Sequence, residues 1–114
     1  YLRMNLRTLI EERYSDFVDL CRVHNVDKIY AFGSSVTNRF NPETSDIDVV
    51  VKVDIPDPVE RGEALLSLWD QLELFFNRKV DLLTDESIHN PYLKTNIDCT
   101  KKLIYDRERE KVLS

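Results

Sequence analysis

The feature that most constrains the fold of this chain is a run of β-branched residues near its middle, Ile47 to Val53. Branched side chains favour extended backbone, and a short apolar run between turn-forming residues is typical of a buried strand. Residues 41–45 before the run and residues 56–58 after it supply those turns. A buried strand must be covered, so we expect a sheet around it with helices packed over the sheet.

Helical and extended patterns alternate on both sides of this strand. Apolar residues recur every three or four positions from Leu6 to about His24, which predicts an amphipathic helix with a candidate break at Ser15-Asp16. This order predicts one α/β (α+β) domain over residues 1–114, with a small mixed β-sheet covered by helices. The other expected strands are residues 28–32, 79–83 and 102–105, and the other expected helices begin at Pro58 and Pro91.

The helix that begins at Pro58 carries a clear start signal. Asp57 stands at the N-cap position and Pro58 at the first helical position, and we expect the helix to end at about Asn77. Its apolar residues cover about half of the circumference, more than a surface helix needs. We expect this face to lie in the core, with contact to a partner as the alternative. The residues of this apolar face are Leu65, Leu66, Leu68, Trp69, Leu72, Phe75 and Phe76.

Composition argues against several classes of protein. The chain has 16 Lys and Arg against 21 Asp and Glu, a net charge of −5, which argues against strong nucleic-acid binding through a broad basic face. No apolar run approaches the ~18 residues that span a bilayer, and no signal-peptide pattern is present, so we expect a cytoplasmic protein without membrane contact. Cys21 and Cys99 have no Cys or His at ligand spacing and are expected to be reduced core thiols.

Two aspartates stand where the central strand begins. Asp46 and Asp48 flank Ile47, so on extended backbone both point to one side, roughly 6 to 7 Å apart. Like charges on one face of a strand repel and call for a cation, and carboxylate oxygens suit Mg²⁺ or Mn²⁺. The alternative is that both are exposed turn residues before the strand starts.

A third aspartate, Asp81, interrupts the apolar strand expected at residues 79–83. A carboxylate in such a strand is costly unless something pairs with it. If Asp81 reaches the face of Asp46 and Asp48, three carboxylates meet in a two-metal site for displacement at phosphorus. The rival candidates for the third ligand are Asp54, Asp85 and Glu86.

A glycine ends the strand expected at residues 28–32. Gly33 is followed by Ser34 and Ser35, so the backbone can turn tightly there and present N–H groups and hydroxyls to an anion. Taken alone, the pattern also fits an ordinary turn.

Together these residues resemble a known family. Gly33-Ser34, an eleven-residue spacer (35–45), the pair Asp46 and Asp48, and Asp81 in a later strand look like the nucleotidyltransferases of the DNA polymerase beta superfamily. The layout from residue 6 to residue 106 is similar to that of the minimal nucleotidyltransferases (MNT). The resemblance implies the nucleotidyltransferase fold and a nucleoside triphosphate, ATP, as substrate.

The resemblance also assigns roles to residues. It implies that Asp46, Asp48 and Asp81 are catalytic and bind two Mg²⁺ ions, with Asp81 also acting as base towards the attacking hydroxyl. The phosphates would be held at the bend that follows the strand. Apart from the resemblance, Lys52 shares strand parity with Asp46 and Asp48, so Lys52 and Lys79 could help to neutralise the leaving group, with the alternative that both lysines end in solvent. The expected phosphate-binding residues are Gly33, Ser34, Ser35 and Arg39.

The acceptor is inferred from what the chain lacks. Family members that modify antibiotics or nucleic acids carry a further domain for the acceptor, and no residues are left here to build one, so we expect a partner protein to present it. In the MNT family the implied activity is AMP transfer from ATP to a tyrosine of a HEPN-family toxin, with this chain as antitoxin. We expect its own Tyr92 and Tyr105 to be packing residues.

Three other functions stay open at this point. The chain could be a catalytically silent module that binds nucleotide or toxin. It could be an interaction module whose carboxylates form a negative surface for a basic partner. It could also be an enzyme that takes a small-molecule acceptor in a homodimer cleft, so a homo-oligomer is an open expectation.

Overall fold

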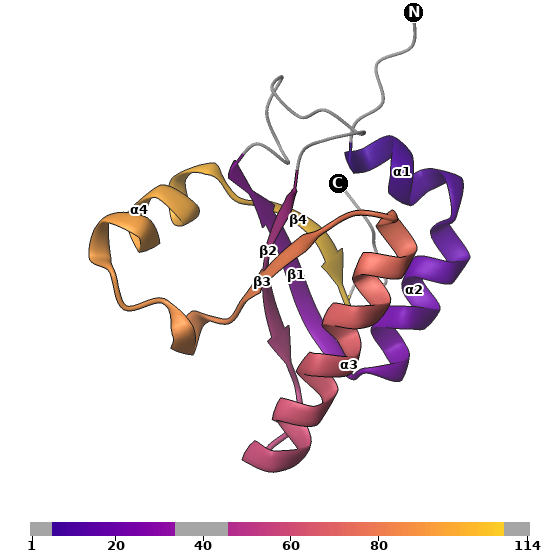
Figure 1. The fold of residues 1–114 in the computed structure, drawn as a ribbon, viewed down its shortest axis with the longest axis horizontal. Coiled ribbons are helices and arrows are strands. Elements are labelled where there is room, and N and C mark those ends of the chain that lie inside the picture. The colour runs from indigo at the N-terminus through magenta and orange to yellow at the C-terminus, as the bar shows by residue number, and fades with distance from the viewer. Residues whose placement is uncertain (1–5, 34–45, 109–114) are drawn as a thin grey trace, which may run out of the picture.

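The computed structural model of the chain describes residues 6–33 and 46–108. These residues form a four-stranded sheet with three helices over one face and a fourth over the other (Figure 1). Among the helices of these two ranges, none combines the length and the apolar character needed to cross a membrane. The elements are α1 (Leu6–Glu12), α2 (Tyr14–Val23), β1 (Val26–Phe32), β2 (Ile47–Val53), α3 (Pro58–Phe76), β3 (Val80–Leu83), the short 3-10 helix η2 (Asp85–Ser87), α4 (Pro91–Thr100) and β4 (Lys102–Asp106).

The sheet has the strand order β3-β2-β1-β4. The central strand β2 pairs antiparallel with β1 and parallel with β3, while β4 pairs antiparallel with β1. The expected mixed sheet is confirmed, and β2 is buried as its β-branched run predicts. Because β2 has a neighbour on each side, its first residues can meet side chains from both neighbours.

The main core lies between the sheet and helices α1, α2 and α3. From β2, Ile47, Val49 and Val51 face this core and are almost fully buried. Phe17 of α2 stands at its centre, with its ring 5.3 Å from that of Phe75 and 6.4 Å from that of Tyr105, centroid to centroid. This apolar layer fixes which face of β2 points inward.

The opposite face of the sheet, the α4 face, is covered by α4. A smaller apolar cluster there joins Phe32 of β1 and Val50 of β2 to Ile97 of α4. Since side chains alternate along a strand, Asp48 and Lys52 share this face with Val50. Asp48, the acidic residue of β2, therefore lies on the face with less helix cover (Figure 1).

The long helix expected over residues 6–24 is in fact two helices. The break falls at Arg13, while Ser15 and Asp16 lie in the first turn of α2. By leaving the helix there, Arg13 places its guanidinium 4.6 Å from the centre of the Phe75 ring and donates a hydrogen bond to the Phe75 carbonyl (3.1 Å). A tertiary contact thus decides where the helix divides.

Helix α3 begins and ends as its local signals predict. The Glu60 N–H donates to the Asp57 carboxylate at 2.9 Å, and Asn77 closes the helix in the left-handed conformation. The expectation that its whole apolar face lies in the core is wrong, because Leu66 is 67 % exposed and Trp69 is 37 % exposed. One side of the helix packs on the sheet, and an apolar face this wide extends past that contact.

Two expectations of burial are also wrong near the C-terminal part of the chain. Cys99 is exposed, whereas Cys21 is buried. Tyr92 is 86 % exposed, whereas Tyr105 is fully buried. Both exposed residues belong to α4, which buries only Ile97 against the sheet, so its other sides face solvent.

Candidate active site

The candidate site begins with the pairing of two strands. In the parallel ladder of β2 and β3, Asp48 lies directly opposite Asp81. Helix α3 holds β3 in this position, because the Val80 N–H donates to the Glu73 carboxylate and the Val80 carbonyl accepts from the Trp69 indole. Two carboxylates from segments far apart in the sequence are therefore neighbours on the α4 face.

Asp48 and Asp81, the acid pair, are like-charged, and Asp48 is partly buried. The pKa of Asp48 is raised from 3.8 to about 6, first by burial and then by the negative charge of Asp81, a hydrogen bond to Asp81 and the charge of Asp46. In that bond the protonated Asp48 carboxyl donates to Asp81. Such a pair favours either a shared proton or a bound cation.

Gly33 brings the end of β1 against the same carboxylate. Phe32 pairs with Asp48 across β1 and β2, and Gly33 follows with φ +64°, a left-handed conformation. A Cβ atom at this position would lie 3.0 Å from Asp48 Oδ2. Glycine is needed twice over, for the bend and for the close approach of the carboxylate.

The structure assembles part of the predicted site. Asp48, Asp81 and Gly33 come together, while Asp46 is exposed just before β2 and acts on Asp48 through its charge. Within residues 6–33 and 46–108, no three His, Cys, Asp or Glu side chains are grouped so that they could hold a metal ion. The three-carboxylate site stays a prediction, and the predicted residues Ser34, Ser35 and Arg39 lie outside the described residues.

The rival acids lie elsewhere. Asp54 follows the far end of β2, where its carboxylate accepts a hydrogen bond from Arg107 at 2.9 Å. Asp85 and Glu86 belong to η2, beyond the end of β3. Of the four acids weighed as third ligand, Asp81 is the one that the strand register sets beside Asp48.

The acid pair fits a divalent cation in its chemistry. Its donors are carboxylate oxygens, and their mutual repulsion, expressed in the raised pKa of Asp48, would be relieved by positive charge. Mg²⁺ is commonly bound through one or two carboxylates, with substrate phosphates and water completing its coordination. The carboxylates of Asp48 and Asp81 are enough to bind Mg²⁺ in this way.

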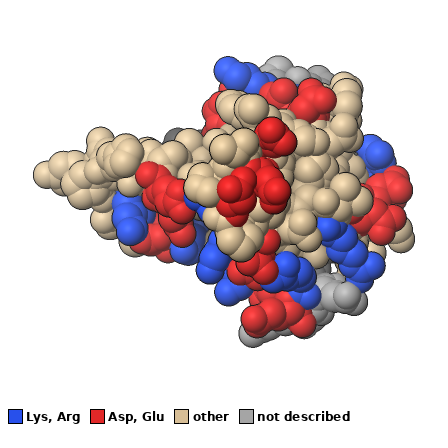
Figure 2. Space-filling model, turned by 90° about the horizontal axis from the view of Figure 1, so that it is seen from below, with Lys and Arg blue, Asp and Glu red and all other residues tan. Residues whose placement is uncertain are grey.

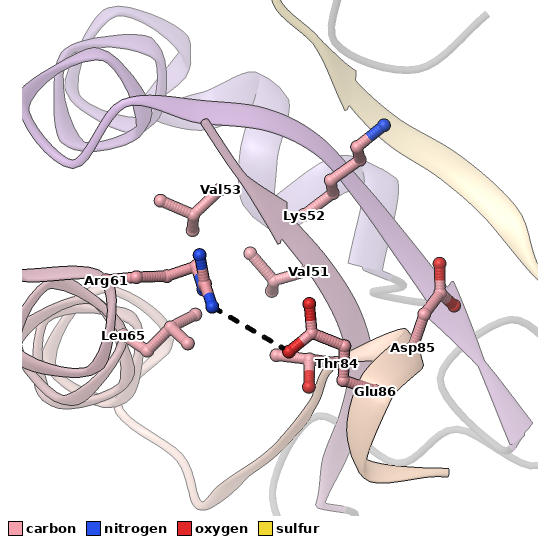
Figure 3. A pocket seen from close by; sticks show the side chains of 8 residues that line it. All are labelled: Val51, Lys52, Val53, Arg61, Leu65, Thr84, Asp85 and Glu86. Atoms are coloured by element: carbon pink, nitrogen blue, oxygen red, sulfur yellow. Dashed lines mark ion pairs between the residues drawn. The ribbon is translucent and has the colours of Figure 1, made fainter. Parts of the chain in front are cut away.

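Two hollows lie along β2 beyond the acid pair. One, of about 200 Å³, opens between the end of β2, the start of α3 and η2, where Arg61 and Glu86 form an ion pair at 4.0 Å (Figure 3). The other, of about 180 Å³, lies on the α4 face and shares Lys52 and Asp85 with the first. Lys52 lies on the face that strand parity predicts, but its side chain is 70 % exposed and pairs with Asp27, so it ends in solvent and not at the acid pair. The residues that join it in this hollow, from β1 and from the position after α4, give no local sequence signal.

Comparisons with known protein families and proteins find related sequences. The model of the nucleotidyltransferase domain matches residues 11–104. A protein of Methanocaldococcus jannaschii named "putative protein adenylyltransferase MJ0126" is 39 % identical over 87 residues, which are 76 % of this chain and 83 % of that protein.

Three solved structures share the fold. The structure of a "putative minimal nucleotidyltransferase" has a TM-score of 0.59 at 22 % identity, covering 90 % of this chain and 98 % of that one. A chain of a toxin-antitoxin structure with AMP-PNP gives 0.57 at 23 %, covering 83 % and 74 %. A chain of the complex of tri-AMPylated Shewanella oneidensis HEPN toxin with MNT antitoxin gives 0.50 at 22 %, covering 87 % and 74 %. The expected nucleotidyltransferase fold is confirmed.

The raised pKa of Asp48 predicts a pH-dependent stability. Since the folded protein holds this proton up to about pH 6 and the unfolded chain releases it near 3.8, the free energy of unfolding falls as pH rises between these values. Asp48→Asn should therefore be more stable than the wild type at pH 8 in EDTA, by about 1 kcal/mol after solvent screening, and equal to it near pH 4. Urea denaturation measures both.

Asp70→Asn, on the exposed side of α3, is the control for this comparison and should match the wild type at both pH values. A stability gain for Asp48→Asn that is the same at pH 4 and pH 8 would contradict the raised pKa of Asp48.

The close approach at Gly33 predicts the effect of a single methyl group. Gly33→Ala should lower the free energy of unfolding by about 1–2 kcal/mol, because alanine is strained at positive φ and its Cβ meets Asp48. Gly62→Ala, a helical position with nothing within 4 Å, is the matched control and should be neutral or stabilising by up to about 1 kcal/mol. Equal stability of Gly33→Ala and the wild type in urea denaturation would show that the contact is absent.

Proposed function

Because this chain belongs to the nucleotidyltransferase domain family, we propose that it transfers AMP from ATP to a tyrosine hydroxyl of a partner HEPN toxin and so acts as its antitoxin. The observation that carries the proposal is the acid pair, Asp48 opposite Asp81, with the Gly33 bend against it. An enzyme of this family needs carboxylates at the reacting phosphate and a bend that can receive the remaining phosphates.

The related proteins support AMP as the group transferred and a protein as the acceptor. The relative from Methanocaldococcus jannaschii is named a protein adenylyltransferase, and it covers most of this chain at 39 % identity. Of the structures with the same fold, one is a toxin-antitoxin structure with AMP-PNP and another contains an AMPylated HEPN toxin with its MNT antitoxin. A HEPN toxin is therefore the partner that we propose.

The residues of the acid pair have distinct roles in this reaction. Asp46 and Asp48 would bind two Mg²⁺ ions, and Asp81 would be a further ligand of the catalytic one. Mg²⁺, when bound, supplies positive charge against the phosphate oxygens. Asp81 takes the proton of the attacking hydroxyl, whose oxygen forms a bond to the α-phosphorus as the bond from that phosphorus to the pyrophosphate oxygen breaks.

The bend at the end of β1 would hold the leaving group. Gly33 allows the backbone to turn with its N–H groups exposed to an anion, and we propose Ser34, Ser35 and Arg39 as the phosphate-binding residues that follow it. In this arrangement the protein contributes mainly position and charge, which is what phosphoryl and nucleotidyl transfer require.

A second candidate function is a catalytically silent module that binds nucleotide or toxin. It is favoured by one observation, that within the described parts of the chain only two of the three predicted acids meet. The two candidates differ in whether AMP becomes covalently attached to another protein.

Transfer of label from α-labelled ATP in the presence of Mg²⁺ separates them. The wild type, incubated with a co-purified HEPN partner, should label that partner, and Asp81→Asn should reduce the rate by about 10²–10⁴-fold because the base and a metal ligand are lost. Asp70→Asn is the control and should label at the wild-type rate. Label on neither protein would favour the silent module, and full activity of Asp81→Asn would remove Asp81 from the mechanism.

A further inference from the structure

A second polar region lies on the α4 face, next to the acid pair. It is the hollow of about 180 Å³ on the open part of the sheet, and side chains from β1, β2, η2 and the residue after α4 line it. Figure 2 shows acidic and basic side chains gathered where the lobe with α4 joins the body of the molecule. The lining residues are Lys28, Tyr30, Val50, Lys52, Asp85 and Lys101.

This hollow is basic in a chain whose net charge is −5. Three lysines line it against one aspartate, Asp85. Lys28 and Lys52 lie directly opposite each other across β1 and β2, and like charges in that arrangement destabilise a sheet. Folding alone therefore does not favour this grouping.

The ion pairs around the hollow offset its charge only in part. Lys52 lies 3.7 Å from Asp27, and Lys101 lies 3.3 Å from Asp98. These pairs are partly or largely exposed, and such pairs contribute little to stability. Lys28 lies opposite Asp106 of β4 in the register, but the ion pairs of the described residues include none that joins Lys28 to an acid within 4.0 Å.

The wall of the hollow also contains an aromatic ring. The Lys101 ammonium lies 4.5 Å from the centre of the Tyr30 ring, which orders both side chains. Val50, almost buried beside them, gives the floor an apolar part. The hollow therefore offers positive charge around an apolar floor, which suits a peptide with acidic side chains more than a small inorganic anion.

The place of the hollow along the strands indicates which reactant it faces. The Gly33 bend lies on one side of Asp48, where the pyrophosphate would leave. In the other direction along β2, Val50 and Lys52 follow at about 7 Å and about 13 Å from Asp48, backbone to backbone. Since the attacking and leaving oxygens lie in line on opposite sides of the phosphorus, an acceptor opposite a leaving group held at Gly33 would come from the direction of the hollow.

We infer that this hollow binds the segment of the acceptor protein that carries the target hydroxyl, and that the segment bears Asp or Glu side chains next to that hydroxyl. The inference rests on the proposed function, since it takes the acid pair as the place of transfer. The adjoining hollow with Arg61 shares Lys52 and Asp85 with it. Figure 3 shows these two residues at that adjoining hollow, together with the ion pair of Arg61 and Glu86.

The test is a binding measurement without ATP, so it does not depend on catalysis. A fluorescein-labelled peptide with a central tyrosine flanked by two glutamates on each side is titrated with the protein, and fluorescence anisotropy gives its Kd. A peptide with glutamines in place of the glutamates is the matched probe. We expect the acidic peptide to bind about tenfold more tightly, with the difference reduced by added salt.

The double variant Lys28→Gln with Lys52→Gln should lose that preference and bind the acidic peptide about tenfold more weakly. Its fold should be preserved, because the change removes a like-charge contact between paired strands. Lys102→Gln is the control: Lys102 pairs with Ala31, whose side chain lies in the main core, so it belongs to the other face of the sheet and its variant should bind as the wild type does.

Two results would overturn the inference. One is equal binding of the two peptides, or unchanged binding of the acidic peptide by the double variant. The other is that the double variant also loses the rise in melting temperature that AMP-PNP with Mg²⁺ gives the wild type, since the hollow would then bind the nucleotide.

A kinetic measurement uses the HEPN partner as acceptor. The double variant should have a KM for that protein about tenfold higher than the wild type, while its KM for ATP stays unchanged. A failure of label transfer by the wild type contradicts the proposed function and leaves the peptide measurement intact.

Discussion

Two carboxylates face each other across the parallel strands β2 and β3, and this repulsive contact is the one on which the site depends. Asp48 and Asp81 are opposed in the ladder, and the pKa of Asp48 is raised because the pair is partly buried and like-charged. Hydrogen bonds between Val80 and two α3 side chains, Glu73 and Trp69, hold β3 in place despite the repulsion. Stability is lost at this point, and the repulsion favours positive charge there, a common relation between strain and function.

The parts of the fold that follow from local chemistry could be predicted from the sequence. The β-branched run of β2 and the aspartate and proline at the start of α3 are such signals, because branched side chains and cap hydrogen bonds act within a few residues. The start of α4 is another, since Asn90 accepts hydrogen bonds from the first N–H groups of that helix. Gly33 also belongs here, because its positive φ follows from a turn that the strand end requires.

The remaining features depend on contacts between distant segments, which no local pattern contains. The break at Arg13 is set by a ring in α3, and the exposure of Leu66 follows from how much of α3 the sheet can cover. The acid spacing suggested one face for Asp46 and Asp48, yet Asp46 precedes the strand and is exposed. The neighbour that Asp48 does acquire, Asp81, is set by the register of β3, which α3 packing determines.

The most direct test of the central claim is where a divalent cation binds. Adding substoichiometric Mn²⁺ to the nucleotide-free protein and recording amide signals by NMR locates the ion, because its unpaired electrons broaden the signals nearest to it. The amides of Gly33, Asp48 and Asp81 should broaden first, before those of the exposed acids of α1 such as Glu11. Broadening that begins at such exposed acids, with those three signals unaffected, would contradict the account.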